Sequence, residues 1–105
     1  MILPGPVRNA VDAANRGDAE AFLDSFVPTG VVDDWGREFA GREAIRGWSD
    51  AEFIGKRVSL AVTDAEEDGA TTVVTADVGG DGFNGPSHFT FTADGPLLSR
   101  MAIRA

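Results

Sequence analysis

The sequence of 105 residues has no cysteine, no tyrosine and a single histidine. Without cysteine the chain forms no disulfides and no thiolate zinc sites, and it has no cysteine nucleophile. One histidine among scattered acids lacks the spacing of a metal site, so we expect no metal. The absence of cysteine also fits a cytoplasmic protein.

Basic residues are few as well. Nine Lys and Arg residues stand against seventeen Asp and Glu residues, which gives a formal net charge of −8. With no basic block to neutralise phosphates, we expect neither nucleic acid nor an anionic membrane surface as a partner. No segment approaches the roughly 20 apolar residues that span a bilayer, and the first residues lack the pattern of a signal peptide.

What the sequence does contain is the composition of one globular domain. Hydrophobic residues make up 43% of the chain and charged residues 25%, which are ordinary values for a folded protein. A chain of this size buries about two-thirds of the surface that its unfolded form exposes. We therefore predict a single domain over residues 1–105, with one core.

Apolar residues recur at helical spacing in three segments. The first predicted helix covers residues 5–16, with prolines in its first turn and a glycine after its last residue. The second is short and covers residues 18–26, with Asp18 as its N-cap. The third begins at Gly41 and ends at Gly55. The apolar faces of the first two helices are too small to bury each other fully, so both need a further layer.

The segment between the second and third helices, residues 31–40, is predicted to form a hairpin. Two valines precede Asp33 and Asp34, which are followed by a turn at Trp35-Gly36 and a short strand from Arg37 to Ala40. Neighbouring residues on a strand point to opposite faces, so only one of the two aspartates can face a cavity. The hairpin places a carboxylate and an indole at a strand end beside a helix, which favours a pocket there.

After the third helix the hydrophobic period changes from helical to the alternation of strands. The predicted strands cover residues 58–63, 71–78, 88–92 and 97–104, with a turn over the acidic run 64–69 and a loose glycine-rich connection over 79–86. Helices followed by antiparallel strands favour an α+β fold in which a bent sheet wraps three helices. The acidic run lacks the spacing of a calcium loop, and no lysine follows the glycines as in a phosphate loop. We therefore expect no cofactor.

Four pieces of the sequence carry a family likeness: Asp18-Ala19-Glu20-Ala21-Phe22, Asp34-Trp35-Gly36-Arg37, Gly41-Arg42-Glu43-Ala44-Ile45, and Phe89-Thr90-Phe91 before Asp94-Gly95. Together they resemble the nuclear transport factor 2-like superfamily, and within it the small SnoaL-like bacterial proteins. The resemblance covers essentially the whole chain. It implies a cystatin-like α+β cone, with three helices packed in a strongly curved antiparallel sheet around an apolar cavity. The superfamily includes isomerases, cyclases, hydrolases, dehydratases and non-catalytic binders, so the fold does not give the activity.

The resemblance also implies a homodimer, because members of the superfamily commonly pair through the outer face of the sheet. The predicted outer face here is mixed, with small and medium side chains and few charges, as a sheet-to-sheet contact requires. Its members are Ser59, Ala61, Val73, Thr75, His88, Thr90, Arg100 and Ala102. The alternative is a solvated sheet face on a monomer.

A catalytic residue is implied in the same way. In ketosteroid isomerase-like members an aspartate at this hairpin is the general base, and the match falls on Asp34, with Asp33 as the alternative if the register differs by one residue. Burial of a carboxylate disfavours its charge, which suits proton abstraction beside a carbonyl. Arg37 would then orient the base. The structural alternative is a turn carboxylate that pairs with Arg37 or accepts N–H bonds at Gly36.

The sequence departs from the isomerase pattern in its polar residues. That chemistry stabilises an oxyanion with a tyrosine hydroxyl and a protonated acid, and this chain has no tyrosine. The only histidine, His88, alternates with Phe89 and Phe91. We therefore expect it on the outer face of the sheet, although histidine serves as an acid–base group in some SnoaL-like cyclases.

Aromatic residues are the predicted walls of the cavity, with core packing as the alternative for each. The predicted ligand-binding residues are Trp35, Trp48, Phe22, Phe53 and Phe89. We predict a dimeric domain that binds a small hydrophobic molecule. Two alternatives stay open: an isomerase, cyclase or dehydratase with Asp34 as general base, and a non-catalytic interaction module whose cavity is filled by its own side chains.

Overall fold

The computed structural model describes residues 2–105. Within them the chain forms three α-helices, one 3₁₀ helix and six strands. In chain order these are α1 (Gly5–Arg16), α2 (Ala19–Asp24), β1 (Phe26–Asp34), β2 (Arg37–Ala40), α3 (Arg42–Glu52), the 3₁₀ helix η1 (Ile54–Lys56), β3 (Ser59–Asp68), β4 (Thr71–Gly79), β5 (Gly85–Asp94) and β6 (Leu97–Arg104).

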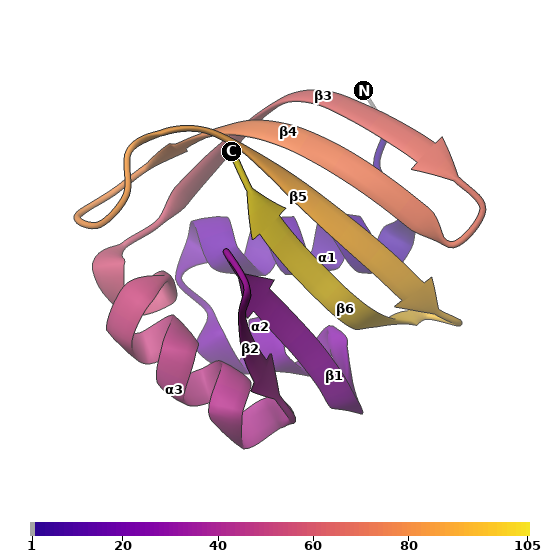
Figure 1. Cartoon of the computed structure of the whole chain (residues 1–105), viewed down its shortest axis with the longest axis horizontal. Coiled ribbons are helices and arrows are strands. Elements are labelled where there is room, and N and C mark those ends of the chain that lie inside the picture. Colours follow the sequence, from indigo (N-terminus) through magenta and orange to yellow (C-terminus); the bar gives the residue numbers. More distant parts are fainter. Residues whose placement is uncertain (1) are drawn as a thin grey trace.

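The strands form one curved sheet in the order β2-β1-β6-β5-β4-β3. The helices pack on its concave side (Figure 1), with α1 against β3, β5 and β6 and α3 against β1 and β2. The predicted α+β architecture, three helices held in a strongly curved sheet, is confirmed. One pair, β1 and β6, is parallel, whereas the sheet was expected to be antiparallel throughout. These two strands are joined through the rest of the domain, so no tight turn fixes their relative direction.

The helices begin and end where their capping residues stand. A left-handed backbone at Gly17 (φ 71°) ends α1, and the Asp18 carboxylate then caps α2 by accepting a bond from the Ala21 N–H at 3.0 Å. The second helix ends at Asp24, two residues earlier than predicted. Phe26 instead begins β1, where it is fully buried and pairs with β6. None of the helices in residues 2–105 is long and apolar enough to cross a membrane.

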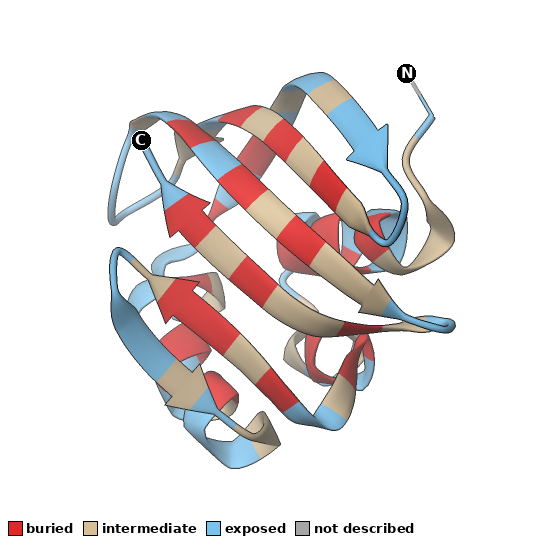
Figure 2. Ribbon diagram, turned by 45° about the vertical axis from the view of Figure 1, so that its right-hand side comes forward, coloured by how far each residue is buried: buried red, intermediate tan, exposed pale blue. Residues whose placement is uncertain are grey.

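Alternation along the central strands separates an inner from an outer face of the sheet. Buried positions form stripes that continue from strand to strand (Figure 2). In one such row, Val32 lies beside Met101, which pairs with Phe91. All three side chains are at most 1% exposed, because they face the helices. The core therefore lies between the inner face of the sheet and the three helices.

The acidic run 64–69 differs from the turn that was predicted there. Strand β3 continues to Asp68, and only Gly69 and Ala70 form the turn. A bulge between Val62 and Asp64 interrupts the pairing with β4. Strand β3 is an edge of the sheet, and its acids past the bulge are exposed. Charged side chains on an edge strand discourage pairing with another chain, which gives a structural reason for the acids.

Candidate functional site

A pocket with a volume of about 260 Å³ opens where the β1–β2 hairpin, the end of α3 and the segment after β4 meet. Its walls are mainly aromatic and aliphatic. Four polar side chains also line it, namely Asp34, Glu52, Lys56 and Ser87. A mostly apolar hollow with a few polar groups is the usual composition of a small-molecule site.

The hairpin positions two functional side chains at the mouth of this pocket. Strands β1 and β2 are joined by the two-residue turn Trp35-Gly36, in which both residues have positive φ (54° and 90°). Such turns match the twist of the flanking strands, and glycine adopts them freely. A tryptophan in this region is uncommon. The turn holds the Trp35 side chain, which is 55% exposed, at the rim of the pocket.

Asp33 points to the outer face of the sheet. Its Oδ1 accepts bonds from the Gly36 N–H (2.7 Å) and Arg104 (3.0 Å), and its Oδ2 accepts from Arg100 (2.7 Å) and Arg104 (3.1 Å). The side chain is buried, with only 6% of the residue exposed. The hydrogen bond from Arg104 is the main reason that the pKa of Asp33 falls from 3.8 to about 2, and it outweighs the effect of burial.

Asp34 points the opposite way, to the inner face, and lines the pocket. Its Oδ2 accepts bonds from the Trp48 indole N–H (3.0 Å) and from Arg37 (2.5 Å). Its Oδ1 accepts no bond from any group in residues 2–105 that the structure describes. No fully enclosed polar side-chain atom in this part of the chain lacks a partner, so Oδ1 keeps accessible surface on a side chain that lines the pocket. The carboxylate is thus held by one oxygen and available through the other.

Trp48 of helix α3 and Arg37 of strand β2 hold this carboxylate. Trp48 and Glu52 are four residues apart and lie on the same side of the helix. Arg37 bridges the two elements, because it bonds Asp34 and both Glu52 oxygens (3.0 and 2.7 Å). The hydrogen bond from Arg37 lowers the pKa of Glu52. Arg37 itself lies behind the carboxylate, with its guanidinium 5.6 Å from the Phe39 ring centre.

Five aromatic residues line the pocket, namely Trp35, Trp48, Phe53, Phe83 and Phe89. Trp48 and Phe53 are stacked with their ring centres 4.8 Å apart, and Phe89 rises from the sheet opposite them. Phe22 is not among the lining residues. It lies one layer deeper, against Phe53 (5.5 Å) and Phe26 (5.3 Å), and is 1% exposed.

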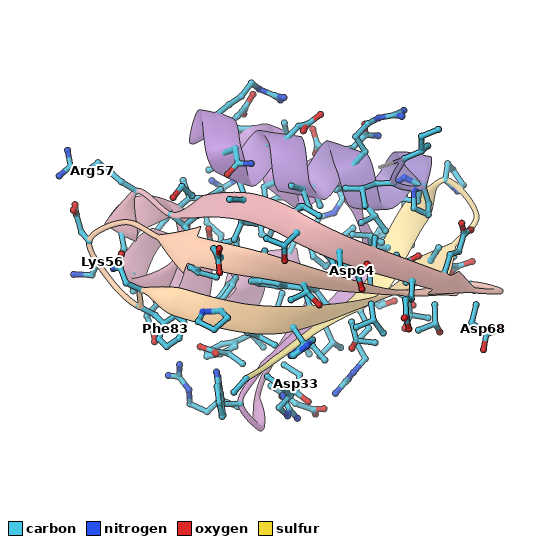
Figure 3. All side chains as sticks on the ribbon, turned by 90° about the horizontal axis from the view of Figure 1, so that it is seen from above. Asp33, Lys56, Arg57, Asp64, Asp68 and Phe83 are labelled. Atoms are coloured by element: carbon cyan, nitrogen blue, oxygen red, sulfur yellow. The ribbon has the colours of Figure 1, made fainter. Side chains whose placement is uncertain are left out.

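The segment between β4 and β5 supplies part of the pocket rim through Phe83, a residue that the sequence analysis did not single out. Phe83 on this segment is 57% exposed and lines the pocket, at the same end of the sheet as Lys56 (Figure 3). The glycines here allow close packing: a Cβ at Gly80 (φ 126°) would lie 2.6 Å from the Arg57 carbonyl oxygen. The Asp81 N–H bonds the Lys56 carbonyl (2.7 Å). The connection expected to be loose is therefore fixed against η1.

Ser87 is another lining residue that the sequence analysis did not predict. It is 2% exposed and precedes Phe89 by two positions on β5. The alternation that places Phe89 and Phe91 on the inner face places Ser87 there as well, so the signal was present in the strand pattern. His88 is exposed on the outer face. Within residues 2–105 no three His, Asp or Glu side chains are grouped to hold a metal ion.

The model of the SnoaL-like domain family matches residues 7–100. The chain belongs to this family. The resemblance to SnoaL-like proteins drawn from the sequence is thus confirmed, and the pocket described above is that of a SnoaL-like domain. No curated protein is similar enough to the sequence to match it.

Solved structures show the same fold. A proposed polyketide cyclase from Sinorhizobium meliloti is 28% identical, with a TM-score of 0.86 and coverage of 97% of this chain and 95% of that one. A protein of ketosteroid isomerase-like fold from Catenulispora acidiphila, solved with trimethylamine, is 23% identical (TM-score 0.83; coverage 99% and 87%). A cystatin-fold protein from Novosphingobium aromaticivorans is 14% identical (TM-score 0.84; coverage 95% and 95%). The last two likenesses concern the fold alone.

The ion pairs of Asp33 with Arg100 and Arg104 on the outer face predict that the folded protein loses stability in acid. The pKa of Asp33 is lower in the folded chain (about 2) than its ordinary value of 3.8, so its contribution to stability is present above pH 4 and is lost as the pH falls towards 2. Replacing Asp33 with Asn should lower the free energy of unfolding at pH 7 by about 2 kcal/mol. Urea unfolding of both proteins at pH 7 and pH 2.5 measures this. If the two proteins differ in free energy of unfolding by the same amount at both pH values, the stabilising role given to the Asp33 carboxylate is contradicted.

Proposed function

We propose that this SnoaL-like domain binds a small, mostly apolar molecule in the pocket, with Asp34 Oδ1 as the acceptor for its polar group. The observation that supports this proposal is that only one oxygen of the Asp34 carboxylate is hydrogen-bonded. Oδ2 accepts from two donors, and Oδ1 accepts from none within residues 2–105. An apolar cavity of roughly 150 Å³ holds benzene. The pocket volume of about 260 Å³ therefore suits a ligand of one or two rings.

Pre-organisation supports the same proposal. Trp48 and Arg37 fix the Asp34 side chain before any ligand arrives, so the cost of ordering it does not fall on binding. A carboxylate oxygen beside apolar rings gains from a ligand donor, because water reaches it poorly there and an unpaired polar atom is costly. Trp35 and Phe83 at the rim are both more than half exposed. A bound ring would cover part of that apolar surface.

Acid–base catalysis by the same carboxylate is the second candidate. An open Oδ1 at the edge of an apolar pocket is placed to take a proton from a carbon next to a carbonyl. Asp34 would be the general base and Arg37 the group that orients it, as part of an isomerase, cyclase or dehydratase. The likeness to the proposed cyclase from Sinorhizobium meliloti, at 28% identity, favours this candidate over other reaction classes.

The third alternative, an interaction module with a filled cavity, has less support. Its defining feature would be side chains that occupy the cone, and the cone contains an open volume of about 260 Å³ instead. The large rings that could have filled it, such as Trp48 and Phe53, stack on each other along one wall.

Replacing Asp34 with Asn tests the binding role. The donors Trp48 and Arg37 require the amide oxygen at the Oδ2 position, so the amide NH₂ takes the Oδ1 position and presents donors where an acceptor stood. We expect the affinity for para-cresol to fall about tenfold or more, as for a bond to a charged group, with toluene affinity unchanged. Tryptophan fluorescence reports binding directly, because both tryptophans line the pocket.

Circular dichroism should confirm that the Asp34→Asn protein is folded. An equal loss of affinity for both probes would show a change in pocket shape rather than a lost hydrogen bond. An unchanged affinity for para-cresol would remove Asp34 from the site. Any substrate that is found later should lose its turnover in the same variant.

We also propose that the domain forms a homodimer through the outer face of the sheet. The centre of this face consists of half-buried small and medium side chains, Val73, Thr75, Thr90 and Ala102. Sedimentation velocity should give twice the chain mass of 11.0 kDa, and Thr90→Glu should yield the monomer, because an unpaired charge would be buried. Ala44→Glu, on the exposed side of α3, is the control that should leave the dimer intact. A wild-type monomer at every concentration would refute the pairing.

A further inference from the structure

Ser87 contributes a polar group to the pocket from the sheet, on strand β5 and away from Asp34. The residue is 98% buried and lines the pocket. Its neighbours on the inner face are apolar: Phe89 follows two positions later, and Ala76 is its partner across the β4–β5 ladder. A hydroxyl in such surroundings needs a hydrogen-bond partner, since its burial is otherwise costly.

The Ser87 hydroxyl has no hydrogen-bond partner among residues 2–105, unlike other shielded serines of the domain. Ser25 Oγ donates to the Ala21 carbonyl (2.9 Å), Ser49 Oγ accepts from the Ile54 N–H (3.4 Å), and Ser99 Oγ donates to the Thr92 carbonyl (3.3 Å). No fully enclosed polar side-chain atom in this part of the chain is without a partner. Ser87 Oγ therefore reaches the pocket surface, where only a solvent molecule or a ligand can bond it.

The sheet register gives the spacing between the two polar groups. Asp34 on β1 lies beside Ile103 of β6, which pairs with Phe89 of β5, and Ser87 lies one inner position further along β5. Two strand spacings, about 10 Å across the sheet, and two residues along β5, about 7 Å, separate Asp34 from Ser87, which together give about 12 Å between the two positions. A hydrogen bond at each end covers about 2.8 Å of this. The remaining gap fits one six-membered ring with a short polar substituent at each end.

We infer that Ser87 Oγ donates a hydrogen bond to a carbonyl oxygen of the ligand, at the end opposite the group that Asp34 accepts. The ligand class is then a small ring compound with a hydroxyl at one end and a carbonyl at the other. Ser87 donates because no acceptor within residues 2–105 takes its proton, whereas the carboxylate of Asp34 can only accept. This inference rests on the proposed function, because it assigns the second polar contact of the same pocket.

Three probes with one ring separate the two contacts: para-hydroxyacetophenone carries both groups, acetophenone only the carbonyl, and para-ethylphenol only the hydroxyl. The variant is Ser87→Ala, read by tryptophan fluorescence titration. We expect the affinity for the two ketones to fall about fivefold to tenfold, the range of one neutral hydrogen bond. The affinity for para-ethylphenol should not change. Lys56→Met, which removes a charged donor that lines the pocket, should leave the preference for ketones intact.

The unliganded Ser87→Ala protein should melt no lower than the wild type, because the change removes a buried hydroxyl without a partner. A clearly lower melting temperature would show that the hydroxyl has a structural bond, and it would overturn the inference. The inference also fails if Ser87→Ala weakens all three probes equally, weakens none, or if Lys56→Met removes the ketone preference. These results leave the proposed function standing. If the wild type binds none of the three, the proposed function fails for one-ring ligands, and the inference fails with it.

Discussion

The hydrogen bond from the Trp48 indole to the Asp34 carboxylate joins helix α3 to the sheet at the mouth of the pocket. Because this bond uses Oδ2, it decides which oxygen a ligand can reach. It also fixes the indole, and with it the stacked Phe53 ring that forms the wall. The Arg37–Glu52 pair makes a second link between the hairpin and α3 and stabilises the same arrangement. The geometry of the site therefore depends on how α3 is held against the β1–β2 hairpin.

The neighbouring residues Asp33 and Asp34 have the same side chain but different roles, because they lie in different environments. Strand alternation turns Asp33 to the outer face, where two arginines and a turn N–H use its two oxygens. It turns Asp34 to the inner face, where Oδ1 is left unbonded by the described chain. The first aspartate is fully committed to the structure, since it holds β1 to β6 through Arg100 and Arg104. The second has an oxygen free to act on a ligand, and that difference comes from a single step along the strand.

The fold could be predicted from local patterns in the sequence. The helix at 5–16, the hairpin around Trp35-Gly36 and the change of period after Lys56 each depend on neighbouring residues, and all three are present. The errors arose where a distant partner decides the structure. Phe26 leaves the second helix because it pairs with Leu98 of β6, and the acidic run stays extended because β4 pairs with it as far as Asp68.

The site was predictable to a similar degree. Asp34, Trp35, Trp48, Phe53 and Phe89 were named from the sequence and all line the pocket. Phe22 does not, because its depth behind Phe53 follows from the packing of α2, which periodicity does not encode. Phe83 reaches the rim through the close approach of the glycine-rich segment to η1, which also depends on contacts distant in the sequence. Ser87 is different, since alternation from Phe89 would have identified it.

The nuclear magnetic resonance signal of the Trp48 indole N–H tests the central claim most directly. The chain has two tryptophans, and Trp35 at the exposed turn serves as an internal reference in the same spectrum. A bond to a carboxylate should shift the Trp48 indole proton to lower field and slow its exchange with water. Both effects should disappear in an Asp34→Ala variant while the Trp35 signal stays in place. A Trp48 indole that exchanges as fast as that of Trp35, with no response to Asp34→Ala, would contradict the account.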